Sequence, residues 1–175
     1  MSTAPQTIKI WDGFVRFFHW SVACLFLLDF WVLEDGDPLH EWAGYVLGAL
    51  VLLRIIWGFI GPQNARFSNF MPTPEGINSH LQKLKTGQLD PRHGHNPLGG
   101  AMVMLLLFLL ILVAVSGWML TLDMFWGEDW VEEFHEISAN VTMAAVVVHV
   151  SAIILVEKLT NISLIKTMLT GKRNL

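Results

Sequence analysis

Cysteine is almost absent from this chain: Cys24 is the only one among 175 residues, and it lies within an apolar run. A single cysteine excludes a disulfide framework, a thiolate cluster for zinc or iron–sulfur, and the C-x-x-C-H motif of covalent cofactor attachment. Charged residues are also scarce, at 15% of the chain. Because 53% of the residues are hydrophobic and the mean hydropathy is +0.50, the composition indicates an integral membrane protein.

Several segments that would divide or process the chain are missing as well. The first residues, Met1 to Ile10, are polar, and the apolar run after them holds Arg16 and His19 near its start, so we expect no cleavable signal peptide. No internal repeat, Gly/Ser linker or low-complexity tract is present. The sequence therefore predicts a single domain over residues 1–175.

Four apolar stretches are long enough to cross about 30 Å of hydrocarbon at about 1.5 Å per residue. Each must be an α-helix, because an isolated span in lipid has to pair its own backbone groups. The expected fold class is thus all-α, an integral membrane four-helix bundle in which short joints make spans one and two, and spans three and four, antiparallel neighbours. The predicted spans are Gly13 to Leu33, His40 to Ile60, Pro97 to Leu122, and Glu133 to Val156.

The segment Gly61 to Asn96 carries several prolines and glycines, and only Ile77 to Leu84 has a short amphipathic pattern. We expect an interfacial loop there. Its end, Asn96-Pro97, is a helix start signal, since asparagine caps helices and proline suits the first helical turn.

Charge is segregated along this topology. All lysines and arginines fall on one side, which by the positive-inside rule predicts that both termini of this multi-pass protein are cytoplasmic. These residues are Lys9, Arg16, Arg54, Arg66, Lys83, Lys85, Arg92, Lys158, Lys166, Lys172 and Arg173. The opposite, periplasmic side is acidic, with Glu34, Asp35, Asp37, Glu41, Asp123, Glu128, Asp129, Glu132, Glu133 and Glu136.

Ionisable side chains inside a span are costly and indicate a functional role. Four histidines fall in this class, whereas His80, His93 and His95 lie in the loop, where solvent or capping contacts suffice. The four are His19, His40, His135 and His149.

The four histidines pair by depth. His135 and His149 are separated by a rise of about 21 Å and a rotation about 40° short of whole turns, so both face the same way. His19 lies about 10 Å in from the cytoplasmic end of the first span, and His149 lies about 12 Å in from that end of the fourth. His40 and His135 both open their spans at the periplasmic side. The predicted pairs are His19/His149 and His40/His135.

Two facing histidines at each of two levels supply both axial ligands of two stacked haems. We therefore expect two haem b groups, held non-covalently by bis-histidine ligation. The alternative is that all four histidines form interhelical hydrogen bonds. Methionines at 119, 124 and 143 are possible but unneeded replacement ligands.

Other residues in the spans suit a large flat cofactor. Gly44 and Gly48 follow His40 on one helical face, and Gly117 interrupts the third span, although such glycines also allow close helix packing. Arg16 and Arg54 near the cytoplasmic ends are candidate partners of haem propionates, and positive-inside anchoring explains them equally well.

Four segments of the chain resemble the bacterial cytochrome b561 family, which includes the cytochrome b subunits of nickel-iron hydrogenases. The resemblance implies a four-helix core with two b haems, ligated by histidines that map onto His19, His40, His135 and His149. Because the family is bacterial, the resemblance also implies that the protein lies in the inner membrane. The family also contains a branch that oxidises superoxide. The segments are Arg16-Phe17-Phe18-His19-Trp20, His40-Glu41-Trp42-Ala43-Gly44, Leu53-Arg54-Ile55-Ile56-Trp57-Gly58 and Gly94-His95-Asn96-Pro97-Leu98-Gly99.

Iron with two imidazole ligands has no open position for dioxygen or peroxide chemistry, so electron transfer is the expected role. We expect electrons to pass between membrane quinone and a periplasmic redox protein such as a c-type cytochrome, which the acidic face would steer. Quinol oxidation releases protons, and Asp29, Glu41 and Glu136 are candidate acceptors. We expect membrane lipid around the spans and no nucleic-acid partner. The sequence leaves open whether the protein forms a homodimer.

Two other functions stay open from the sequence. One is a superoxide:quinone oxidoreductase, although an acidic face without lysine or arginine attracts a small anion poorly. The other is a haem-bearing membrane anchor subunit of a larger, hydrogenase-like redox complex.

Overall fold

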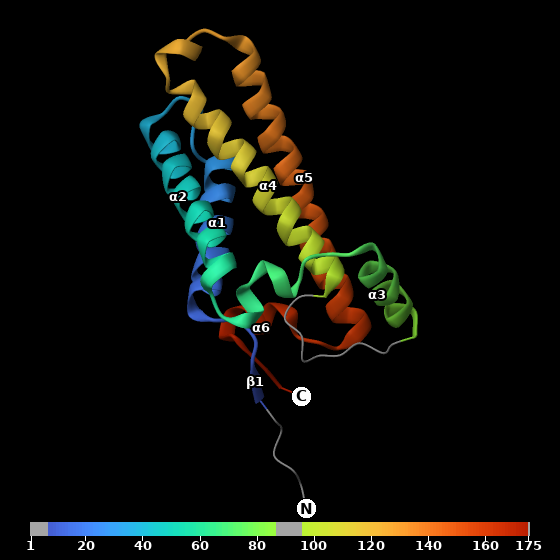
Figure 1. The fold of residues 1–175 in the computed structure, drawn as a ribbon. Coiled ribbons are helices and arrows are strands. Elements are labelled where there is room, and N and C mark those ends of the chain that lie inside the picture. Colours follow the sequence, from blue (N-terminus) through green and yellow to red (C-terminus); the bar gives the residue numbers. More distant parts are fainter. Residues whose placement is uncertain (1–6, 87–95, 175) are drawn as a thin grey trace, which may run out of the picture. The chain divides into compact units, whose positions relative to one another are not determined.

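The structure is a computed structural model that describes residues 7–86 and 96–174, so His93 and His95 lie outside the described residues. The described chain is helical apart from two three-residue strands (Figure 1). In chain order the elements are β1 (Thr7–Lys9), α1 (Gly13–Trp31), α2 (Pro38–Ile60), η1 (Gln63–Ala65), η2 (Phe67–Asn69), α3 (Pro74–Thr86), α4 (Pro97–Leu120), η3 (Asp123–Phe125), α5 (Asp129–Thr160), α6 (Leu164–Thr170) and β2 (Lys172–Asn174).

Four of these helices, α1, α2, α4 and α5, are long and apolar enough to cross a membrane, with mean hydropathies from 1.4 to 3.0 in their most apolar windows. The predicted all-α membrane fold with four spanning helices is therefore confirmed. The bounds differ by a few residues at most ends. α5 differs most: it begins at Asp129 and ends at Thr160, because polar residues outside the apolar stretch continue the helix at both ends.

Side-chain caps fix where two of the spanning helices begin. Oδ1 of Asp12 accepts a hydrogen bond from the backbone N–H of Val15 (3.0 Å) at the start of α1. Oδ1 of Asn96 accepts one from the N–H of Gly99 (2.6 Å) at the start of α4. These bonds satisfy N–H groups that the first helical turn leaves unpaired. The start predicted at Asn96-Pro97 is confirmed.

The segment between α2 and α4 has more regular structure than the predicted interfacial loop. It contains η1, η2 and α3, and α3 includes the stretch whose amphipathic pattern the sequence shows, Ile77 to Leu84. The ring of Phe67 in η2 packs so closely on Gly58 of α2 that a Cβ there would overlap it. At 13 residues, α3 is too short to span a bilayer.

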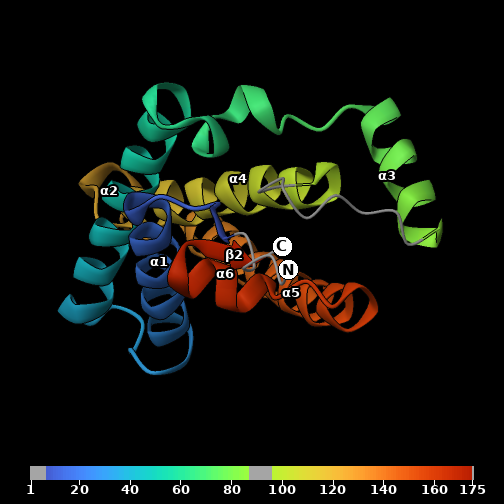
Figure 2. The same ribbon diagram turned by 90° about the horizontal axis from the view of Figure 1, so that it is seen from below.

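The chain forms two compact units. Unit 1 comprises Met1–Phe17, Ile56–Val103 and His149–Leu175, and unit 2 comprises Phe18–Ile55 and Met104–Val148. In unit 1, β1 and β2 pair antiparallel, with Ile8 opposite Arg173. α6 lies beside the N-terminal end of α1 in both ribbon views (Figures 1 and 2).

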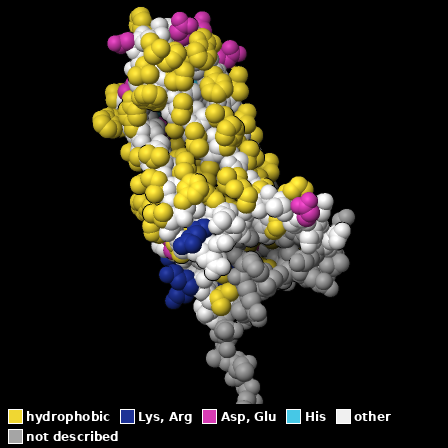
Figure 3. Space-filling view, in the orientation of Figure 1, with side chains coloured by type: hydrophobic (Ala, Val, Ile, Leu, Met, Phe, Trp, Pro, Cys, Tyr) yellow, Lys and Arg dark blue, Asp and Glu magenta, His cyan; other side chains and the backbone are white. Residues whose placement is uncertain are grey.

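Unit 2 contains segments of the four spanning helices, together with η3 and the turns that join α1 to α2 and α4 to α5. Small and apolar side chains fill its interior, including Val22, Leu47 and Leu107. Large hydrophobic side chains also cover the outside of the spanning helices (Figure 3). This pattern is typical of helices whose outer surface contacts lipid.

Candidate cofactor site

The structure brings His40 and His135 together within unit 2. His40 lies in the first turn of α2 and His135 lies in the second turn of α5. The centroids of the two imidazole rings are 6.2 Å apart, and the ring planes are nearly perpendicular, at 86°. Both side chains are half-buried.

The Nδ1 atom of His40 contacts a carboxylate. It lies 2.9 Å from Oδ1 of Asp29, which is in the last turns of α1. Both atoms are buried, and among the described residues neither has a hydrogen bond of good geometry, so this ion-pair contact is the closest polar interaction of each. Asp35 also approaches this nitrogen, at 4.0 Å, but its side chain is fully exposed. A carboxylate can only accept here, so this contact favours the His40 tautomer with the proton on Nδ1.

The Nδ1 atom of His135 contacts a hydroxyl instead. It lies 2.9 Å from Oγ of Ser116 on α4. The single hydroxyl proton of Ser116 is donated to the carbonyl oxygen of Leu112 (2.7 Å). The hydroxyl oxygen therefore accepts from His135, and this ring, too, carries its proton on Nδ1.

In both rings the lone pair is then on Nε2, the protonation state that a metal-ligating histidine requires. Two imidazoles on opposite sides of one metal have centroids about 6 Å apart, given metal–nitrogen bonds of about 2 Å and about 1 Å from nitrogen to ring centre. The observed 6.2 Å fits that spacing. His40 and His135 are therefore the two residues that would hold a haem iron at this end of unit 2.

The three candidate glycines have different surroundings. A Cβ on Gly117 would lie 3.0 Å from Cε1 of His135, which is closer than an ordinary contact, so a larger residue here would require the ring to shift away from α4. A Cβ on Gly48 would make an ordinary contact with Ala114 (3.5 Å), which fits close helix packing. A Cβ on Gly44 would meet no described atom within 4 Å, so open space lies beside α2 one turn after His40.

The other two histidines fall in different units: His19 is on α1 in unit 2, and His149 is on α5 in unit 1. Both are half-buried. The His19 ring packs edge-on against Trp20, with centroids 4.9 Å apart.

The two candidate arginines also differ. Arg54 is buried in unit 2, at 3% exposure, within the spanning helix α2. Nε of Arg16 donates a hydrogen bond to the carbonyl of Met168 (3.3 Å), and its Nη2 donates one to the carbonyl of Leu169. Arg16 thus ties α1 to the end of α6 in unit 1. Both propionate roles stay predictions.

The acidic side chains gather where α1 joins α2 and α4 joins α5, at one end of unit 2 (Figure 3). Most of them are exposed, including Asp35, Glu41, Glu132 and Glu133. Tyr45 and Thr121 lie at the same end of unit 2, where the tyrosine hydroxyl donates a hydrogen bond to Oγ1 of the threonine (3.2 Å). The only lysine or arginine within unit 2 is Arg54.

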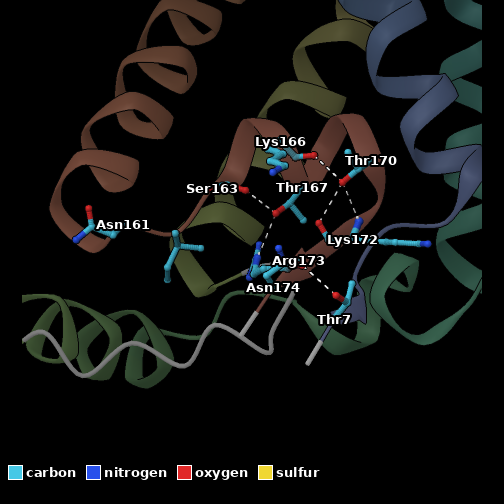
Figure 4. Close-up of a pocket in the computed structure, with 10 residues that line it drawn as sticks. Thr7, Asn161, Ser163, Lys166, Thr167, Thr170, Lys172, Arg173 and Asn174 are labelled. Atoms are coloured by element: carbon cyan, nitrogen blue, oxygen red, sulfur yellow. Dashed lines mark hydrogen bonds between the residues drawn. The ribbon is translucent and has the colours of Figure 1, made fainter. Parts of the chain in front are cut away.

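A separate pocket lies in unit 1, after the end of α5, and has a volume of about 310 Å³. Threonine and serine hydroxyls, backbone groups and basic side chains line it, and no histidine does (Figure 4). Thr167 donates to the carbonyl of Ser163 and accepts from Nε of Arg173 (3.3 Å), so hydrogen bonds hold α6 against β2. The pocket lacks the ligands that an iron would need.

Sequence reasoning missed Ser116 and gave Asp29 a different role. A serine beside Gly117 in an otherwise apolar helix is the signal that would have pointed to the first. Asp29 was predicted as a candidate proton acceptor, and the structure places its carboxylate on a histidine ring.

Comparisons with known proteins bear on the cofactor. Residues 10–171 match the family model described as prokaryotic cytochrome b561. A probable Ni/Fe-hydrogenase B-type cytochrome subunit from Rhizobium leguminosarum bv. viciae is 22% identical over an alignment that covers 96% of this chain and 89% of that protein. No solved structure matches the chain. The chain therefore belongs to the prokaryotic cytochrome b561 family and is a haem b-binding electron-transfer protein of a bacterial membrane.

Proposed function

We propose that this protein carries electrons between the quinone pool and a periplasmic redox protein, and that His40 and His135 are the axial ligands of one haem. The observation that carries the proposal is the pairing of these two rings at 6.2 Å, with Nδ1 of His40 in contact with the Asp29 carboxylate and Nδ1 of His135 hydrogen-bonded to Ser116. This arrangement leaves Nε2 of each ring to bind iron.

In this proposal the surrounding side chains fix the ligands before the cofactor binds. Asp29 and Ser116 set the tautomers of His40 and His135, and Gly117 makes room for the second ring. Haem b would supply a one-electron Fe(III)/Fe(II) couple at this site. Because two histidines fill both axial positions, no ligand position remains for a substrate, which favours electron transfer over oxygen chemistry.

A second haem held by His19 and His149 completes the proposal, and it rests on their matching depth in the sequence. Two sites about 20 Å apart would carry electrons across the membrane. The charge pattern supports an inner-membrane location with both termini in the cytoplasm, so that His40 and His135 would lie near the periplasmic surface.

The acidic end of unit 2 supports docking of a basic partner, and a c-type cytochrome is the partner class we propose. Exposed carboxylates without neighbouring lysines would speed and orient its approach. Because Asp29 is engaged with His40, Glu41 and Glu136, which are exposed beside the two ligands, are the better candidates to accept protons from quinol.

A second candidate function is a membrane subunit that relays electrons for a larger redox complex. The name of the Rhizobium relative, a hydrogenase cytochrome subunit, favours it. The two candidates differ in two observables. The purified anchor would transfer no electrons to a soluble cytochrome, and it would copurify with a catalytic subunit when expressed in its own host.

The test is electron transfer by purified protein in liposomes. A quinol in the membrane should reduce the bound haem, and added c-type cytochrome should reoxidise it. The matched variant His40→Ala should lose this transfer. If the protein has its full haem content and quinol still does not reduce the haem, the quinone-linked function is contradicted.

A further inference from the structure

The two paired histidines have chemically different partners. Nδ1 of His40 meets a carboxylate, that of Asp29, whereas Nδ1 of His135 meets the neutral hydroxyl of Ser116. The Asp29 side chain is only 14% exposed, and that of His40 is 22% exposed. Water therefore screens this carboxylate less than it screens an exposed one, so its charge acts more strongly on the ring.

A buried carboxylate changes the electronic character of a histidine ligand. A carboxylate next to a ligating imidazole raises the basicity of the ring and makes it a better electron donor to the metal. A stronger donor stabilises the more highly charged, oxidised metal. The hydroxyl of Ser116 has no net charge, so its effect on His135 is smaller.

We propose that Asp29 is a positioning residue that holds His40 through the contact of its carboxylate with Nδ1, and that it lowers the reduction potential of the iron that His40 binds. The inference rests on the proposed function, in which His40 is an axial ligand. It assigns to Asp29 a role in setting the potential of the haem, which is separate from accepting protons from quinol.

Asp35 provides a comparison within the same structure. Its carboxylate also points toward Nδ1 of His40, but at 4.0 Å and with a fully exposed side chain. Water screens such a charge, so its influence on the ring is weak. Removing the charge of Asp29 should therefore change the haem far more than removing that of Asp35.

The test is a potentiometric titration of purified Asp29→Asn and Asp35→Asn, with haem content measured for each. Asparagine keeps the size and the accepting oxygen of Asp29 and removes only the charge. At a fixed ambient potential, Asp29→Asn should shift the reduced-to-oxidised ratio of one haem about tenfold toward reduced, equal to about 59 mV for a one-electron couple. Asp35→Asn should shift it less than about threefold, about 28 mV on the same scale.

An unchanged potential in Asp29→Asn with full haem content would overturn the proposal, as would an equal shift in both variants. If Asp29→Asn binds no haem at this site, the variant Asp29→Glu tests the proposal instead. Haem retained by the glutamate variant would show that His40 needs a charged partner. Loss of haem from both variants would contradict the proposal. Failure of the ligand assignment itself is visible separately, because His40→Ala would then keep all of its haem.

Discussion

Oγ of Ser116 on α4 lies 2.9 Å from Nδ1 of His135 on α5, and it must accept that bond because its own proton goes to the carbonyl of Leu112. One hydroxyl thus fixes the tautomer of a ring in the neighbouring helix. Its donation to a carbonyl four residues earlier in turn fixes the serine rotamer.

Replacing this serine should loosen the ligand that it holds. Ser116→Ala removes the acceptor of a buried N–H, at a cost of about 1 to 3 kcal/mol, so we expect protein with one haem bound more weakly. The strength of haem binding is measured as the haem that each chain retains after dilution or after competition with apomyoglobin. Ser138→Ala is the control, because Ser138 is also a buried serine of unit 2 and forms no hydrogen bond with a histidine among the described residues; its backbone carbonyl accepts a hydrogen bond from Thr142. Equal haem loss from both variants would contradict a specific role.

Adding one methyl group at Gly117 should displace the same ring. A Cβ there would lie 3.0 Å from Cε1 of His135, so Gly117→Ala should move the imidazole and reduce the haem content of that site at least severalfold. Gly13→Ala, where a Cβ meets no described atom within 4 Å, should retain all of its haem. Full occupancy in Gly117→Ala, with an unchanged Soret spectrum, would show that His135 is not held as a ligand against α4.

Arg16 has two possible roles that one variant separates. Its guanidinium donates to carbonyls at the end of α6, and such charged hydrogen bonds stabilise by about 1.5 to 3 kcal/mol. We expect Arg16→Gln to lower the apparent melting temperature in detergent while two haems per chain remain. Lys158→Gln, which removes an exposed charge at the end of α5, should change neither quantity. Loss of one haem in Arg16→Gln would instead assign Arg16 to a propionate.

The acidic end of unit 2 predicts a salt-dependent reaction with a basic partner. The second-order rate of electron transfer to a c-type cytochrome should fall about tenfold or more between low and physiological ionic strength. The triple change Glu132→Gln, Glu133→Gln and Glu136→Gln should lower the rate at low salt, whereas Glu75→Gln on α3 should not. A rate that does not respond to salt would rule out electrostatic docking.

The proposed topology can be tested by labelling. In a Cys24→Ser background, Glu133→Cys should react with a membrane-impermeant maleimide in intact spheroplasts, and Lys172→Cys should react only after lysis. Both positions are exposed in the structure. Labelling of Lys172→Cys in intact spheroplasts would reverse the orientation.

The spanning helices were predictable because their signal is local. Long apolar runs define α1, α2, α4 and α5, and Asn96-Pro97 marks where α4 begins. The ends of α5 were missed because residues such as Asp129 and Lys158 are polar yet continue the helix. The pairing of β1 with β2 joins Thr7 to Asn174 from opposite ends of the chain, and no local pattern encodes it.

The pairing of His40 with His135 was predictable from depth, since both open their spans at the same surface. Their partners were not. Asp29 reaches His40 from another helix, and Ser116 reaches His135 from a third, so each contact depends on helix rotation and packing. The sequence marks such residues only as polar groups in apolar helices.

The most direct test of the account is haem quantification on purified protein, by pyridine haemochrome and a reduced-minus-oxidised spectrum, for wild type and for single alanine variants of the four spanning histidines. We predict two b haems per chain in the wild type. His40→Ala and His135→Ala should lose the same haem, identified by its midpoint potential, and His19→Ala and His149→Ala should lose the other. Wild-type protein with one haem or none, or His40→Ala and His135→Ala that lose different haems, would contradict the pairing on which the account depends.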